Sequence, residues 1–185
     1  MEVTNSLLVA LMFVTILTLG IANILMALAS VVDPESRGSL DVLHTGWALI
    51  LLFAHFDFFW HTLDIVTKED WDFLGFLYLE AGPILIFFAT SVLLTDTGTE
   101  NLRAYYFRIH TRFFLLFAFL QAWAIGADLV LGKGLIGIDA INVAVGPLAL
   151  VLATSRAERL HLGLTGAVAV AYVIAAGMRG AGLIV

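Results

Sequence analysis

The chain has 185 residues, of which 61% are hydrophobic and only 13% are charged, and its formal net charge is -6 at pH 7. This composition is typical of integral membrane proteins, and the length fits a single domain. The absence of cysteine excludes disulfides, iron–sulfur clusters and cysteine nucleophiles, and no basic run suggests nucleic-acid binding.

Six apolar segments are long enough to cross a bilayer as helices, which requires roughly 18 residues or more. No segment has the alternating pattern of a strand, and a bilayer admits only helices or closed barrels. The sequence therefore predicts an all-α polytopic membrane protein, with residues 1–185 forming one transmembrane domain. The six predicted spans are 6–32, 42–66, 72–95, 104–131, 135–153 and 160–183.

An internal repeat links the second and third spans to the fourth and fifth. Residues 51–91 recur without a gap as residues 115–155, at a constant offset of 64, and both copies contain Leu-Leu-Phe-Ala, Gly-Pro and Ala-Thr-Ser. The alternative is chance similarity between apolar segments. The pattern predicts tandem parallel helical hairpins, with copies at about 41–95 and 105–159 flanked by the first and last spans.

Orientation follows from the distribution of basic residues, because cytoplasmic loops are enriched in Lys and Arg. We therefore expect both termini on the non-cytoplasmic side, most simply in a bacterial cytoplasmic membrane. The loops after spans 1, 3 and 5 and the residues beside them contain Arg37, Arg103, Arg108, Arg112, Arg156 and Arg159, whereas the other side has Lys68, Lys133 and Arg179.

Three polar side chains are expected near one another in the outer half of the membrane. Asp57 and His61 are four residues apart and so share one face of the second span. Glu80 lies at a similar depth on the third span, roughly 12 Å from its outer end. Gln121 takes the place of Asp57 in the second copy of the repeat.

An ionisable side chain at this depth is costly unless it is paired or hydrated, so it marks a candidate functional site. A desolvated carboxyl group tends to keep its proton, and a neighbouring histidine can relay it. The main prediction is therefore a proton or small-cation pathway formed by Asp57, His61, Glu80 and Gln121.

Two other interpretations remain open, and the sequence leaves undecided whether the protein is an enzyme. Asp57, His61 and Glu80 offer the oxygen and imidazole ligands of a divalent transition metal, which would indicate a membrane-embedded redox or hydrolytic enzyme. Alternatively, the polar residues only fix the packing of the helices. The protein would then be a non-catalytic subunit or scaffold that binds partners or lipid.

Two further segments indicate contacts with lipid or with another helix. The beginning of the fourth span is basic and aromatic, which is typical of an anchor at anionic headgroups. It comprises Arg103, Tyr105, Tyr106, Arg108 and Arg112. The last span carries small residues at four-residue spacing, Gly163, Ala167, Ala171 and Ala175, which favour close helix packing within the chain or in a homo-oligomer.

The region from Trp47 to Phe114 resembles a loose group of bacterial six-helix integral membrane proteins to which no activity is assigned. The resemblance covers less than half of the chain and implies six spans and a membrane location. It rests on Trp47, Trp60, Trp71, Phe73, Pro83, Leu102, Arg103, Ala104, Tyr105, Tyr106, Phe113 and Phe114.

Overall fold

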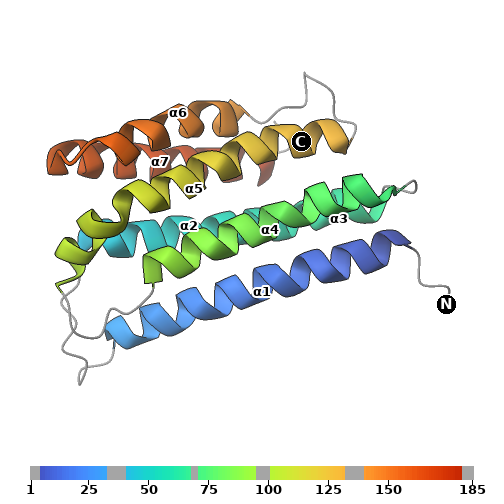
Figure 1. The fold of residues 1–185 in the computed structure, drawn as a ribbon, viewed down its shortest axis with the longest axis horizontal. Coiled ribbons are helices and arrows are strands. Elements are labelled where there is room, and N and C mark those ends of the chain that lie inside the picture. The colour runs from blue at the N-terminus through green and yellow to red at the C-terminus, as the bar shows by residue number, and fades with distance from the viewer. Residues whose placement is uncertain (1–4, 33–40, 68–70, 95–100, 132–139, 181–185) are drawn as a thin grey trace.

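The protein is a bundle of helices in the computed structural model, which describes residues 5–32, 41–67, 71–94, 101–131 and 140–180. No strand occurs in these ranges. The helices are α1 (Asn5–Val32), α2 (Val42–Trp60), α3 (Thr62–Thr67), α4 (Phe73–Leu94), α5 (Leu102–Val130), α6 (Ala140–Thr154) and α7 (Glu158–Gly180) (Figure 1).

Within the described ranges, five segments are long and apolar enough to cross a membrane: Asn5–Ser30, Val42–Thr67, Phe73–Leu94, Leu102–Val130 and Glu158–Met178. The second of these contains both α2 and α3. This confirms the helical class and agrees with five of the six predicted spans.

The fifth predicted span is only partly matched. Helix α6 has 15 residues, and at about 1.5 Å per residue it would extend roughly 22 Å, less than the hydrocarbon core of a bilayer. Residues 135–139 of the predicted span lie outside the described residues. The described part of this segment is therefore a short apolar helix rather than a full span.

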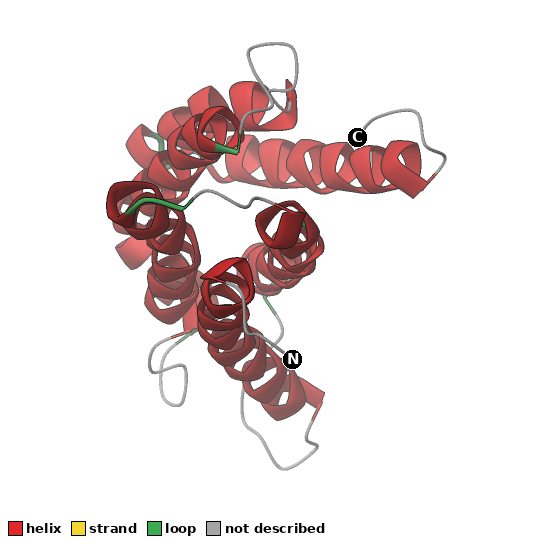
Figure 2. Cartoon of the chain, turned by 90° about the vertical axis from the view of Figure 1, so that its right-hand side faces the viewer, coloured by secondary structure: helices red, strands yellow, loops and turns green. Residues whose placement is uncertain are grey.

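Helix α5 occupies the centre of the bundle. It packs along α6 on one side and α4 on the other, and α1 covers the far side of α4 (Figure 1). Helix α7 packs against α2 and α6, and Figure 2 shows it at the edge of the bundle. The predicted repeat is not confirmed, because α5 and α6 contact each other far more extensively than the corresponding pair α2 and α4.

An aromatic cluster ties α2 to α5 and α7. The Trp47 ring is fully buried and lies edge-on to Phe113, Phe114 and Phe117, with centroid distances of 5.4, 4.9 and 5.2 Å. Its indole Nε1 donates a hydrogen bond of 2.9 Å to Thr165 Oγ1 on α7. Buried indoles need such an acceptor, so this bond fixes the position of α7 against α2.

The small residues of α7 do not form the internal packing face that their spacing predicts. Gly163 and Ala167 are exposed, Ala171 is half-buried, and only Ala175 is buried. The buried face of α7 instead carries His161, Thr165, Val168 and Tyr172. Two of these larger side chains bond to neighbouring helices: Thr165 to Trp47 of α2, and His161 to Tyr106 of α5. Packing of the exposed small residues against a second copy stays a prediction.

Candidate functional site

A cavity of about 60 Å³ lies in the half of the bundle where α3 and α5 end. Each water molecule needs roughly 10–15 Å³ of such volume, so the cavity has room for a few waters. Its polar lining comes from four helices: Asp57 on α2, His61 at the junction of α2 and α3, Gln121 and Asp128 on α5, and Asn142 on α6, with Tyr172 of α7 beside them.

Asp57 and His61 lie next to each other, as their spacing predicts. The His61 Nδ1 donates a hydrogen bond of 2.8 Å to the Asp57 main-chain carbonyl and lies 4.0 Å from Asp57 Oδ2. The side chains are 28% and 18% exposed, respectively. The pair therefore lies at the wall of the cavity rather than sealed inside the protein.

The second span is interrupted at His61. Helix α2 ends at Trp60 and α3 begins at Thr62. The hydroxyl of Thr62 donates to the carbonyl of Phe59 at 2.7 Å, so a side chain satisfies one of the carbonyls near the break. His61 itself keeps right-handed helical dihedrals, with φ −69° and ψ −7°, and its N–H still donates to the Asp57 carbonyl at 3.2 Å, so the break is confined to one residue. Here the interruption coincides with the cavity wall.

Gln121 is the most deeply buried polar side chain of the cavity, with 2% exposure. Its Oε1 makes no hydrogen bond to any described residue. Helix α6 passes close by, since a Cβ added at Gly146 would lie 3.5 Å from Gln121 Cβ. Gln121, predicted as part of the pathway, thus lines the cavity and carries a buried acceptor without a partner in the described part of the chain.

Aromatic rings from α2 and α5 form part of the cavity wall. Phe58 and Trp123 both line the cavity and stack with their centroids 5.4 Å apart. Trp123 is buried against α4 because Gly82 has no side chain: a Cβ there would lie 2.1 Å from the indole. The wall is therefore closely packed on its aromatic side.

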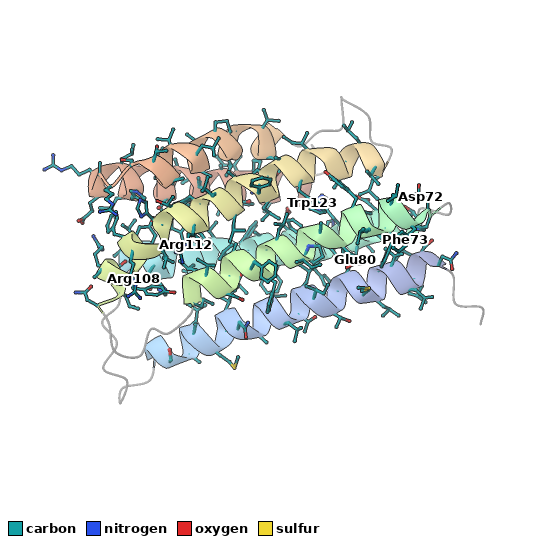
Figure 3. The ribbon with its side chains drawn as sticks, viewed as in Figure 1. Asp72, Phe73, Glu80, Arg108, Arg112 and Trp123 are labelled. Carbon is teal, nitrogen blue, oxygen red and sulfur yellow. The ribbon has the colours of Figure 1, made fainter. Side chains whose placement is uncertain are left out.

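Glu80 is buried but does not line this cavity. Its side chain is 1% exposed, and neither carboxyl oxygen has a hydrogen-bond partner among the described residues. Its neighbour Leu79 contributes to the cavity wall. Figure 3 shows Glu80 in the half of the bundle that carries Asp72 and Phe73, away from Arg108 and Arg112.

The structure thus brings together three of the four predicted pathway residues, Asp57, His61 and Gln121, and leaves Glu80 outside their cavity. Across the described ranges, no three His, Asp or Glu side chains are grouped closely enough to hold a metal ion. The metal site of Asp57, His61 and Glu80 therefore finds no support in this arrangement.

Asp128 and Asn142 are cavity residues that the sequence prediction missed. The sequence spacing could have indicated Asp128, because it follows Gln121 by seven residues and so shares its helix face. It is also the repeat counterpart of Asp64. Asn142 follows a segment outside the described residues, and nothing in the sequence directs its side chain toward α5.

A fully buried histidine outside the cavity, His55, lies against α1. His55 has no exposed surface, and its Nδ1 donates to the carbonyl of Leu51 at 2.8 Å. Its Nε2 makes no hydrogen bond to the described residues. The ring fits only because residue 20 is glycine, since a Cβ at Gly20 would lie 2.1 Å from Nε2.

The predicted lipid anchor on α5 divides into two groups. Tyr105 and Tyr106 are buried, so their side chains face the interior of the bundle rather than its surface. Their hydroxyls find partners inside the bundle: Tyr105 donates to the carbonyl of Val92 at 2.7 Å, and Tyr106 lies 2.7 Å from His161 Nδ1.

The arginines of the same segment also differ from one another. Arg103 forms ion pairs with Asp41 and Glu158, so it joins α5 to the start of α2 and of α7 rather than extending freely into headgroups. Arg108 and Arg112 are exposed, and Arg108 lies over the ring of Tyr105 at 5.2 Å. Their role as lipid anchors stays a prediction.

Comparison with known proteins gives no family: no family model, curated protein or solved structure matches the chain. The resemblance to bacterial six-helix proteins therefore stays a prediction. The helices have the length and apolar character of an integral membrane protein.

Proposed function

We propose that the protein passes protons or a small cation across a membrane through the cavity beside His61. One observation carries this proposal: Asp57, His61, Gln121 and Asp128 line a common space at an interruption of a span otherwise long and apolar enough to cross a membrane. Polar groups inside an apolar bundle raise the free energy of the folded protein. Their convergence on one cavity therefore favours a path for a hydrated or charged species.

In this proposal Asp57 and His61 bind the transported species, and Glu80 acts farther along the path as a buried proton-binding group. Support for Glu80 comes from its burial and from the lack of a described partner for either oxygen. A residue with only a structural role would be expected to pair with a neighbouring donor, because unpaired buried polar groups destabilise the fold.

The test is flux into vesicles that contain the purified protein, followed with a pH-sensitive dye and with cation-selective probes. Asp57→Asn is expected to reduce flux at least tenfold, because it removes the charge but keeps the shape. The matched control is Asp64→Asn, since Asp64 is on α3 but does not line the cavity.

Glu80→Gln is tested beside Glu158→Gln, whose carboxylate is 55% exposed at the other end of the bundle. Flux should fall in Glu80→Gln alone. If Asp57→Asn and Glu80→Gln both conduct like the wild type, and only their thermal stability changes, the polar residues serve packing and the transport proposal is wrong.

The proposal places the arginine-rich end in the cytoplasm of a bacterium, with both termini outside. It is supported by the exposed Arg108, Arg112, Arg156 and Arg159, which lie on the first half of α5 and around the start of α7. Cytoplasmic ends of membrane proteins are enriched in such residues. The cavity then opens in the outer half of the bilayer.

A further inference from the structure

The polar groups around the cavity consist largely of oxygen donors. Asp57 and Asp128 contribute carboxylates, and Gln121 and Asn142 contribute amides, while no Lys or Arg of the described residues lines the space. Carboxylate and carbonyl oxygens with water are the ligands that hard cations prefer. The charge and the donor set of the cavity therefore select against anions.

The buried acceptor of Gln121 points independently to an occupant. Gln121 is 98% shielded from solvent, its side chain lines the cavity, and its Oε1 has no hydrogen-bond partner in the described part of the chain. Buried acceptors are normally satisfied, since leaving one unpaired is costly. A cation or its bound water would satisfy this oxygen.

We propose that the cavity binds one monovalent alkali cation that keeps part of its hydration shell, with Gln121 Oε1 and the carboxylates of Asp57 and Asp128 as its protein ligands. This assignment rests on the proposed function, in that it names the species that the cavity passes. It adds Asp128 to the transport site and gives Gln121 the role of a ligand.

Size and ligand grouping favour a hydrated monovalent ion over a divalent one. The volume of about 60 Å³ exceeds that of a bare ion and leaves room for water between the ion and the walls. Divalent ions bind most firmly where several charged ligands converge, and no such group of three occurs among the described residues.

The site can be tested by ²³Na relaxation on the purified protein in detergent, with NaCl replacing choline chloride at constant ionic strength. Wild-type protein should give saturable line broadening that KCl reverses. Gln121→Leu should weaken Na⁺ binding at least tenfold, because it removes the acceptor while keeping a side chain of similar size.

The matched control is Thr90→Val. Thr90 also carries a fully buried hydroxyl oxygen without a described partner, but it does not line the cavity. Its substitution should leave Na⁺ binding unchanged. If Gln121→Leu does not fold, Asp128→Asn replaces it and is expected to weaken Na⁺ binding by a similar factor.

Three results would overturn the assignment: no saturable Na⁺ binding by the wild type, equal binding by wild type and Gln121→Leu, or displacement of Na⁺ by micromolar Mg²⁺. Failure of this inference is separate from failure of the proposed function. Proton flux that Asp57→Asn abolishes, without Na⁺ binding, would support the transport proposal alone; Na⁺ binding without flux would support the site alone.

Discussion

Tyr78 and Trp123 exchange hydrogen bonds across the α4–α5 interface. The Tyr78 hydroxyl donates to the Trp123 carbonyl at 3.0 Å, and the Trp123 indole donates to the Tyr78 carbonyl at 2.7 Å. Their rings stack with centroids 6.2 Å apart. Because Trp123 also lines the cavity, this pair fixes the position of α4 along the bundle axis relative to the candidate site.

Removing one of these bonds should loosen the interface measurably. Tyr78→Phe is expected to reduce the free energy of unfolding by about 1 kcal/mol, since it deletes one donor and keeps the ring. Thermal denaturation in detergent would measure the change. Trp60→Phe is the control, because Trp60 is 65% exposed, and it should unfold like the wild type. Equal destabilisation by both variants would show that the Tyr78–Trp123 exchange is not the cause.

Gly20→Ala should destabilise the contact between α1 and α2. The added methyl would lie 2.1 Å from His55 Nε2, and overpacking of this kind costs about 1–3 kcal/mol. Gly163→Ala is the matched control, since nothing lies within 4 Å of a Cβ at Gly163. That variant should be neutral or slightly more stable, because alanine favours helix.

The steric explanation can be tested in a protein that already carries His55→Ala. If the His55 ring is the obstacle, Gly20→Ala should have almost no further effect once His55→Ala has been made. An undiminished effect there would place the steric conflict elsewhere.

The two ion pairs of Arg103 should differ in strength. Asp41 has a side chain only 7% exposed and also caps α2 by accepting from the His44 backbone N–H at 2.9 Å, whereas the Glu158 side chain is 55% exposed. Asp41→Asn keeps a capping side chain but removes the charge, and it should lower the free energy of unfolding by roughly 1–3 kcal/mol. Glu158→Gln should cost less than about 1 kcal/mol, as for surface pairs. A larger effect at Glu158 in denaturation experiments would contradict this ranking.

The orientation can be tested directly because the chain contains no cysteine. We expect Ala157→Cys, in the exposed connection between α6 and α7, to react with a membrane-impermeant maleimide only after the cells are permeabilised. Asp72→Cys, exposed just before α4, should react in intact cells. The reverse pattern would place the arginine-rich end outside and the cavity in the inner half of the membrane.

The sequence predicted where the described helices lie, except that the fifth span is matched only by the short helix α6. Long apolar runs separated by turn residues specify helices in lipid, and the spacing of Asp57 and His61 specifies a shared face. It could not predict that Glu80 lies outside the cavity. In a membrane helix that is apolar around its whole circumference, the pattern gives depth but little information about rotation around the axis.

The tyrosines of α5 illustrate a related limit. Aromatic residues next to arginine are common at membrane surfaces, but tyrosine is equally stable in a protein interior when its hydroxyl has a partner. For Tyr105 and Tyr106 those partners, Val92 and His161, come from other helices, α4 and α7. Only the tertiary structure distinguishes the two environments.

The interruption at His61 has a mechanical consequence. A continuous helix resists bending along its whole length, but a span made of two helices concentrates bending at the residue that joins them. A tilt of α3 relative to α2 would therefore change the angle at His61 and strain mainly the backbone hydrogen bonds at the junction, from His61 N–H to the Asp57 carbonyl and from Asp64 N–H to the His61 carbonyl. Since His61 and Asp57 form one side of the cavity, such a tilt would widen or narrow it while the aromatic side, fixed by Trp123 and Tyr78, stays in place.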